Sequence, residues 1–288
     1  MLNVQKLMNE YKRQTVESVN GFTTKAGAMR ALNDAGFSMA GLLAAAESNP
    51  KLAKNGLQGV YAKPLHLAPA SLSGFNLCAM ASAGCIAACL HTAGNPVYMP
   101  QKTLSRIAKS KAYMTQRKAF MALLTFEIAL TVRQAEKKRM QPAIRLNATS
   151  DIPFESVAVE IDGIKYANLF TAFPNVEFYD YTAIPKRALK FARGQFPANY
   201  HLTFSRKENN DSACHEVLNA GGNVAIVFGS KDTATQESIA RAHGFNAPLV
   251  NADLHDFRPL DGKGVIAALY AKGDAKTDES GFVLYGKD

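Results

Sequence analysis

Three of the four cysteines in this 288-residue chain lie within twelve residues of one another, at Cys78, Cys85 and Cys89. Thiolates are the soft ligands that iron–sulfur clusters and zinc prefer, and thiolates close in sequence can bind one metal centre. A structural site normally uses four protein ligands, whereas a reactive site keeps one position open. The triplet therefore predicts a metal centre with one exchangeable position.

The spacing favours a [4Fe–4S] cluster over zinc (Zn). Zinc fingers and ribbons typically use two tight cysteine pairs. Here three residues separate Cys85 from Cys89, and Cys78 lies seven residues before Cys85. Iron–sulfur ligation is compatible with such a single-loop triplet. His91 could complete a zinc site, and Cys214, in a predicted helix, is more typical of a buried small residue than of a fourth ligand.

Polar side chains follow several predicted strands, where βα folds gather their functional residues. Any one of them could instead cap a helix or stabilise a turn. Together they predict a pocket for a small polar or anionic substrate or cofactor. The candidate pocket residues are Asn147, Ser150, Asp151, Tyr179, Asp180, Ser205, Arg206 and Asp253.

The elements that must position these residues alternate between short apolar runs and helical segments, which is typical of parallel βα units. We expect an α/β fold with a full or partial parallel (β/α) barrel, and an open doubly wound sheet is the alternative. No Gly-x-Gly-x-x-Gly follows a strand, which disfavours dinucleotide binding. The predicted strands are 61–70, 143–147, 176–180, 200–205, 223–228, 247–251 and 265–270. Helical or loop segments are predicted between the later strands, at 161–172, 185–193, 212–219 and 232–243.

The predicted organisation has two parts. An N-terminal helical segment, residues 1–57, precedes a barrel-like domain, residues 58–288. That domain contains a cysteine-rich loop at 71–95 and a long basic helix at 101–139.

The formal net charge of +9 is concentrated in the basic helix, since residues 101–140 hold ten Lys or Arg against two Glu. Such a segment is either a solvated helix face or a contact surface for nucleic acid. For nucleic acid, the expected contacts are Lys109, Lys111, Arg117 and Lys118.

Several of these motifs resemble the gene product 88 family of bacteriophage proteins. The resemblance covers about Tyr61 to the C-terminus and implies a phage origin, without an assigned activity. The segments that carry it are 65–70, 73–78, 84–94, 145–155, 178–182, 202–206 and 253–258.

A cysteine triplet after an early strand, followed by a parallel barrel, is also similar to radical S-adenosylmethionine enzymes. In that superfamily three cysteines hold a [4Fe–4S] cluster and S-adenosylmethionine chelates the open iron. The resemblance implies that Cys78, Cys85 and Cys89 are the cluster ligands. The superfamily pattern is C-x3-C-x2-C, whereas this chain has C-x6-C-x3-C.

The chain has no apolar run long enough to span a bilayer and no signal-peptide core, so we expect a cytoplasmic protein without a membrane partner. In the cytoplasm, clustered cysteines favour metal binding over disulfides. Three functions are compatible with the sequence. They are an iron–sulfur enzyme acting on a small polar or nucleic-acid-linked substrate, a nucleic-acid-binding protein with structural zinc, and a metal-free barrel acting as an enzyme or as an inhibitor of a host system.

Overall fold

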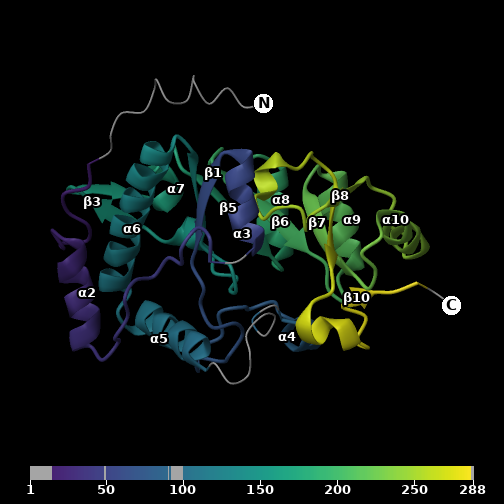
Figure 1. Ribbon diagram of the computed structural model, residues 1–288, viewed down its shortest axis with the longest axis horizontal. Helices are drawn as coiled ribbons and strands as arrows, with labels where there is room; N and C mark the ends of the chain where they lie inside the picture. Colours follow the sequence, from purple (N-terminus) through teal and green to yellow (C-terminus); the bar gives the residue numbers. More distant parts are fainter. Residues whose placement is uncertain (1–14, 49, 90, 92–99, 287–288) are drawn as a thin grey trace.

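A curled parallel sheet forms the centre of the molecule and makes a half-barrel (Figure 1). Its strands follow the spatial order β1-β2-β5-β6-β7-β9-β8, and β10 pairs with the end of β7. The order is sequential as far as β7, as in a barrel, but the last two strands are exchanged. The predicted parallel (β/α) barrel is therefore confirmed in its partial form. The computed structural model describes residues 15–48, 50–89, 91 and 100–286, so parts of the predicted segments 1–57 and 71–95 lie outside the described residues.

The strands of the half-barrel match the predicted apolar runs closely, because strands buried on both faces contain nearly continuous apolar residues. They are β1 (Val60–Pro64), β2 (Gln141–Arg145), β5 (Glu177–Thr182), β6 (Tyr200–Ser205), β7 (Asn223–Phe228), β8 (Leu249–Asn251), β9 (Ile266–Tyr270) and β10 (Val283–Leu284). A separate antiparallel pair consists of β3 (Val159–Ile161) and β4 (Ile164–Tyr166).

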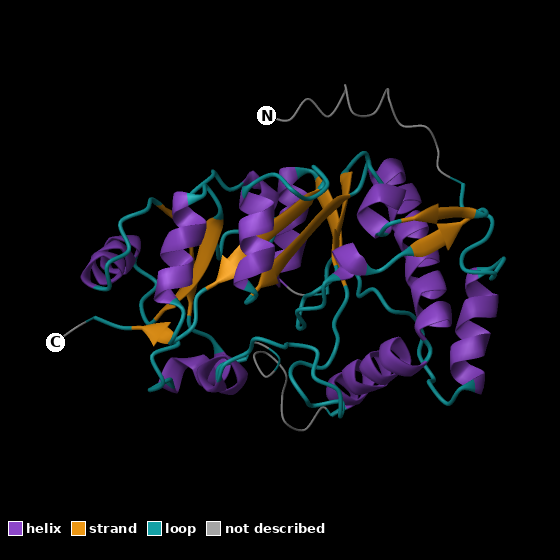
Figure 2. Cartoon of the chain, turned by 180° about the vertical axis from the view of Figure 1, so that it is seen from behind, coloured by secondary structure: helices purple, strands orange, loops and turns teal. Residues whose placement is uncertain are grey.

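Helices connect the strands and cover the outer face of the sheet, which faces the viewer in Figure 2. The α-helices are α2 (Lys25–Asp34), α3 (Pro50–Ala53), α4 (Ala83–Ala87), α5 (Gln101–Thr115), α6 (Arg117–Lys138), α7 (Leu169–Ala172), α8 (Pro185–Ala192), α9 (Asp211–Asn219) and α10 (Thr233–Ala242). Short 3-10 turns are η1 (Lys54–Gln58), η2 (Phe154–Ser156), η3 (Arg258–Leu260) and η4 (Gly273–Thr277). None of the helices in the described part of the chain is long and apolar enough to cross a membrane.

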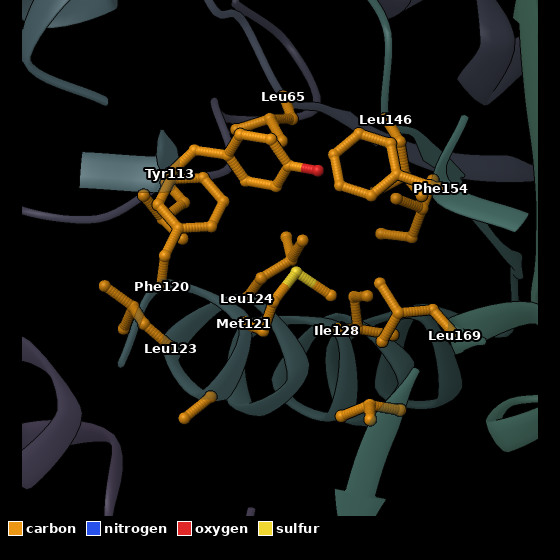
Figure 3. Close-up of a cluster of buried hydrophobic side chains, with 14 of the residues drawn as sticks. Leu65, Tyr113, Phe120, Met121, Leu123, Leu124, Ile128, Leu146, Phe154 and Leu169 are labelled. Carbon is orange, nitrogen blue, oxygen red and sulfur yellow. The ribbon is translucent and has the colours of Figure 1, made fainter. Parts of the chain in front are cut away.

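The largest core lies around α6, which is buried along most of its length (Figure 3). Phe120, Leu124 and Ile128 are fully buried and repeat at helical spacing. The rings of Tyr113 and Phe120 meet edge to face at 5.3 Å. Leu32 of α2 joins the same core, so the described part of the predicted N-terminal segment packs on the barrel-like domain.

The inner face of the half-barrel is filled by two segments that are far apart in the sequence. Leu52 of α3 and Phe257 pack on Ala143 and Tyr179 of the sheet. The side-chain oxygen of Asn55 accepts hydrogen bonds from the N–H groups of Asp256 (2.9 Å) and Phe257 (3.2 Å). The two segments therefore form one cover over the inner face.

The predicted basic helix 101–139 is two helices, not one. Gln116 lies outside the helical region (φ −126°, ψ 43°), and the chain turns there between α5 and α6. The Arg117 guanidinium lies 4.0 Å from the centroid of the Tyr113 ring, and its Nε donates to the Tyr113 carbonyl (3.0 Å). This break lets α5 lie along the strand ends while α6 packs on the sheet (Figure 1).

The prediction of a helical or loop segment at 161–172 was wrong for its first half, which belongs to the β3–β4 hairpin. Asp162 (φ 51°) and Gly163 (φ 77°) form its two-residue turn. Asp-Gly favours this turn because both positions require positive φ. In the predicted helical segment 1–57, residues 35–48 form turns and extended chain, and α2 is the N-terminal helix of the described residues.

Candidate functional site

The cysteine loop, residues 71–89, lies at the carboxyl edge of the half-barrel, along which α4 and α5 run in Figure 1. Two loops that follow strands hold it there. After β2, the N–H of Asp151 donates to the Leu77 carbonyl (2.8 Å). After β6, the ammonium group of Lys207 donates to the Met80 carbonyl (2.6 Å). The loop is therefore tied to the ends of two central strands.

Glu208 fixes the start of α4 within this loop. Its carboxylate accepts hydrogen bonds from the Ser82 hydroxyl (2.6 Å) and from the Gly84 N–H (2.9 Å). The Ser82 hydroxyl in turn accepts from the N–H of Cys85 (3.3 Å). A carboxylate at a helix N-terminus satisfies N–H groups that have no partner within the helix. Glu208 thereby sets the backbone position of one of the three cysteines.

The three thiols are half-buried and close enough to influence one another electrostatically. Burial raises the pKa of Cys78 to about 11 and of Cys85 to about 12, and it also raises the pKa of Cys89. A negative charge on Cys89 contributes to the rise at both of the other thiols. Positive charge lies nearby, because Lys207 lowers the pKa of Cys85 and Arg106 lowers that of Cys89.

The side chains of the cysteine loop are not arranged around a single point. Within the described residues, no group of three or more His, Cys, Asp or Glu side chains has the arrangement that holds one metal ion. Ligation by this triplet therefore requires the loop to rearrange so that the thiols come together. The fourth cysteine, Cys214, is fully buried in α9, and its thiol lies 3.6 Å from the Asn210 side-chain oxygen.

Four of the predicted pocket residues belong to one buried hydrogen-bond network. Asp180 accepts from the backbone N–H (2.6 Å) and the side-chain amide (3.1 Å) of Asn147, and from the Tyr200 hydroxyl (3.3 Å). Asn147 accepts from the Ser150 hydroxyl (2.9 Å). Burial raises the pKa of Asp180 to about 7.

Arg187 of α8 completes this network. It donates to Asp151 and makes a two-pronged contact with Glu155 at 2.6 and 2.8 Å. It also donates to the Tyr200 hydroxyl (2.9 Å). Because these groups have partners within the protein and lie beneath the helices of the outer face, the network holds the β2 and β5 loops in place.

Two further pocket candidates, Tyr179 and Ser205, face the other way, onto the inner face. Successive side chains of a strand point to opposite faces, so Tyr179 and Asp180 are separated by the sheet. The Tyr179 hydroxyl donates to Asp256 (3.0 Å), which is also paired with Arg145 (2.8 Å). Burial alone would raise the pKa of Asp256, but Arg145 and other positive groups lower it to about 2.

The last two pocket candidates form ion pairs with residues outside both groups. Arg206 pairs with Asp211 (2.8 Å) and donates to the carbonyl of Phe282 (3.2 Å), which ties the C-terminal strand to β6. Asp253 pairs with Lys272 (2.6 Å). The eight candidates are therefore one buried network and several separate contacts, and no single pocket brings them together.

Sequence reasoning missed several polar residues that border the cysteine loop or the inner face. Lys207 and Glu208 anchor the loop, and His66, Tyr181 and Thr203 lie on or beside inner-face positions of the strands. The two-residue period was the available signal, because Tyr179 and Tyr181 alternate with outward-facing residues, as do His201, Thr203 and Ser205.

The four residues predicted to contact nucleic acid differ in their exposure to solvent. Lys111, Arg117 and Lys118 are exposed, and the latter two line a hollow of about 410 Å³ beside Asn20 and Gly21. Lys109 points inward and donates to a backbone carbonyl, that of Leu42, at 2.9 Å. Three of the four residues predicted to contact nucleic acid are thus on the surface.

Comparison with known proteins gives a family. No curated protein and no solved structure matches the chain. The model of the family described as gene product 88 matches residues 42–286, so the match begins earlier than the expected start near Tyr61. It includes the cysteine loop, the half-barrel and the cover over its inner face. The chain belongs to the gene product 88 family of bacteriophage proteins.

Proposed function

We propose that the protein binds an iron–sulfur cluster through Cys78, Cys85 and Cys89 and acts as a radical-type enzyme on a small polar or nucleic-acid-linked substrate, with S-adenosylmethionine as a second cofactor. The observation that carries the proposal is the position of the cysteine loop. It lies at the carboxyl edge of a parallel half-barrel, where βα folds bind their ligands.

The surroundings of the loop support this assignment. Iron binds thiolates, so a site of this kind needs nearby positive charge and donors. Lys207 lies near Cys85 and Arg106 lies near Cys89. Arg106 donates to the carbonyl of His91 (3.2 Å), which holds the chain just after the last cysteine.

When bound, a cluster with an open position supplies an electron and a binding site for a chelating cofactor. The chain's own residues would hold and orient the reactants. Glu208 fixes the backbone at Gly84, and the loop after β2 fixes the backbone at Leu77. Cys78 and Cys85 directly follow these two anchors, and all three thiols of the loop are half-buried.

Anaerobic reconstitution with iron and sulfide tests the proposal directly. We expect about four iron atoms and four labile sulfides per chain, with broad visible absorbance, in the wild type. Cys85→Ser should lose most of this iron. Cys214→Ser is the matched control and should retain it, because Cys214 lies outside the loop.

Two results would count against the proposal. One is a reconstituted wild type without iron, and the other is equal iron in the wild type and in Cys85→Ser. The second cofactor is tested separately, because S-adenosylmethionine should change the electron paramagnetic resonance spectrum of the reduced cluster. An unchanged spectrum would leave cluster binding intact but remove the radical-type assignment.

A second candidate function is nucleic-acid binding, with zinc in place of the cluster. The observation that favours it is the exposure of Lys111, Arg117 and Lys118 around the junction of α5 and α6, beside a surface hollow. Exposed Lys and Arg on one surface are the groups that neutralise phosphates. If this function is correct, the affinity for an oligonucleotide should fall steeply as the salt concentration rises.

A further inference from the structure

Buried polar side-chain atoms without a hydrogen-bond partner are concentrated on one side of the sheet. In well-packed proteins the large majority of buried polar groups are paired, so such a concentration requires an explanation. In the described part of the chain these atoms are His66 Nδ1, Arg145 Nε, Tyr181 OH, His201 Nε2, Thr203 Oγ1 and Arg258 Nε.

These atoms come from neighbouring positions on the inner face. Tyr181 and Thr203 are directly paired across β5 and β6. The Arg145 guanidinium lies 4.8 Å from the centroid of the Tyr181 ring. Arg258 lies on η3, which packs against β6, and its charge influences both Tyr181 and His201. Four of the unpaired atoms therefore belong to residues that neighbour one another between the sheet and its cover, namely Arg145, Tyr181, Thr203 and Arg258.

The unpaired groups share the ability to donate. An arginine Nε–H can only donate a hydrogen bond. In Arg145 the Nη1 group is occupied by Asp256 (2.8 Å), and in Arg258 the terminal nitrogens are occupied by Asp261 (3.0 Å) and the His255 carbonyl (2.6 Å). The hydroxyls of Tyr181 and Thr203 can also donate. A ligand that satisfies these groups must present several acceptors.

The charge around His66, at one end of this region, is mainly positive, whereas around Tyr181 the charges of Arg145 and Arg258 are balanced by those of Asp256 and Asp261. The charged groups around His66 are Arg106, Arg145 and Lys109 on the positive side and Asp256 on the negative side. Burial, followed by these three positive charges, lowers the pKa of His66 to about 3, so its imidazole is neutral at pH 7. His66, Arg145 and Tyr181 are only partly buried as whole residues, although their unpaired atoms are buried.

We propose that the inner face binds a small oxyanion, as a carboxylate or phosphate group, with Arg145, Tyr181, Thr203 and Arg258 as its hydrogen-bond donors. The inference depends on the proposed function only in one respect, because it treats the oxyanion as part of the enzyme's substrate. The binding itself does not depend on a cluster.

Titration of the metal-free protein with inorganic phosphate, and separately with succinate, tests the inference. Spectra that resolve the arginine Nε–H signals should show the Arg145 and Arg258 signals shifting with one of the two anions. Potassium chloride at the same ionic strength should not produce the shift. Whichever anion binds more tightly identifies the source of the oxyanion group.

Thr203→Val removes one donor without changing the side-chain shape, and Tyr181→Phe removes another. Each should weaken anion binding by about tenfold, as expected for losing a hydrogen bond to a charged group. Thr131→Val is the matched control, since this buried threonine lies in α6 and donates to the Glu127 carbonyl (2.7 Å). It should leave binding unchanged.

The folded state of each variant can be checked by thermal unfolding. Thr203→Val should unfold at no lower temperature than the wild type without anion, because it removes a buried hydroxyl that has no partner. If Thr203→Val does not fold, the anion affinity of Tyr181→Phe still tests the inference.

The same titration in Cys85→Ser separates this inference from the proposed function. If Cys85→Ser binds the anion and the reconstituted wild type contains no iron, the anion site is supported and the cluster proposal fails. Arginine signals that stay unmoved by either anion, or equal affinity in the wild type, Thr203→Val and Tyr181→Phe, would overturn the inference whatever the iron content.

Discussion

The carboxylate of Glu208 and the backbone N–H of Gly84 are joined by a 2.9 Å hydrogen bond between the loop after β6 and the cysteine loop. A Cβ at position 84 would lie 2.9 Å from a Glu208 oxygen and 2.2 Å from the Ser280 hydroxyl, so these side chains would have to move to accept it. The position of Cys85 therefore depends on a close approach that a larger residue at position 84 would disturb.

Gly84→Ala should displace the start of α4. We expect it to destabilise the protein by about 1–3 kcal/mol, the usual range for overpacking. It should also increase the rate at which a thiol reagent modifies the loop cysteines. Gly286→Ala is the control, because a Cβ there meets no atom within 4 Å. Equal modification rates in the two variants would show that the Gly84 contact does not order the loop.

Arg187→Met should cost about 3–5 kcal/mol, because it leaves the carboxylates of Asp151 and Glu155 buried without their partner. Chemical denaturation of the wild type and the variant measures this difference. Arg193→Met is the matched control. Its ion pair with Glu216 is more than half exposed and 3.8 Å long, so its loss should change stability by less than about 1 kcal/mol.

Asp256→Asn should destabilise the cover over the inner face, and the effect should depend on pH. The pKa of Asp256 falls from 3.8 to about 2 on folding, so its ion pair with Arg145 stabilises the folded state fully above pH 3.8. That contribution is lost as the pH falls through 2. The stability difference between the wild type and Asp256→Asn should therefore narrow between pH 5 and pH 2 and stay constant above pH 5.

His66→Gln should make the protein less sensitive to acid. The pKa of His66 is about 3 in the folded state and 6.5 in the unfolded state. Below pH 6.5 the unfolded chain takes up a proton that the folded chain does not, so stability is lost as the pH falls toward 3. Unfolding measured from pH 7 to pH 4 should show a steeper decline in the wild type than in His66→Gln. Parallel declines would show that His66 is not held neutral by its surroundings.

Changing Lys111, Arg117 and Lys118 together to Gln tests nucleic-acid binding. If these residues neutralise phosphates, affinity for a labelled oligonucleotide should fall. The slope of log affinity against log salt should also decrease by about 0.7–0.9 for each phosphate that the variant no longer neutralises. The control changes Lys186, Lys190 and Lys263, which are also exposed, so the net charge is the same in both variants. Equal affinity in the two variants would contradict the nucleic-acid function.

The strands were the most predictable part of the fold. The predicted strands 200–205 and 223–228 match β6 and β7, because turn residues bound each apolar run. The break at Gln116 was not predictable in the same way, because no proline or glycine marks it. It is accompanied by a local contact that the sequence pattern does not reveal, the packing of Arg117 on Tyr113.

The candidate site was harder to predict than the strands. The sequence places polar residues at strand ends, but it does not say which ones find partners within the protein. Asp151 and Asp180 are satisfied by Arg187, Tyr200 and Asn147, which come from other elements. By contrast, the unpaired state of Thr203 depends on what the cover places opposite it. The distinction between a structural and a binding residue thus depends on long-range packing.

The hydrogen bonds from Asp256 and Phe257 to Asn55 also set the order in which the protein can be completed. Residues about 200 positions apart must meet before the inner face is closed, and contacts of such high sequence separation carry a large loop-closure entropy that slows folding. During synthesis, the ribosome has released the cysteine loop and most of the sheet before Asp256 emerges. Newly made chains therefore pass through a stage in which the cysteine loop has been synthesised while the inner face of the sheet still lacks the part of its cover that Asp256 and Phe257 supply.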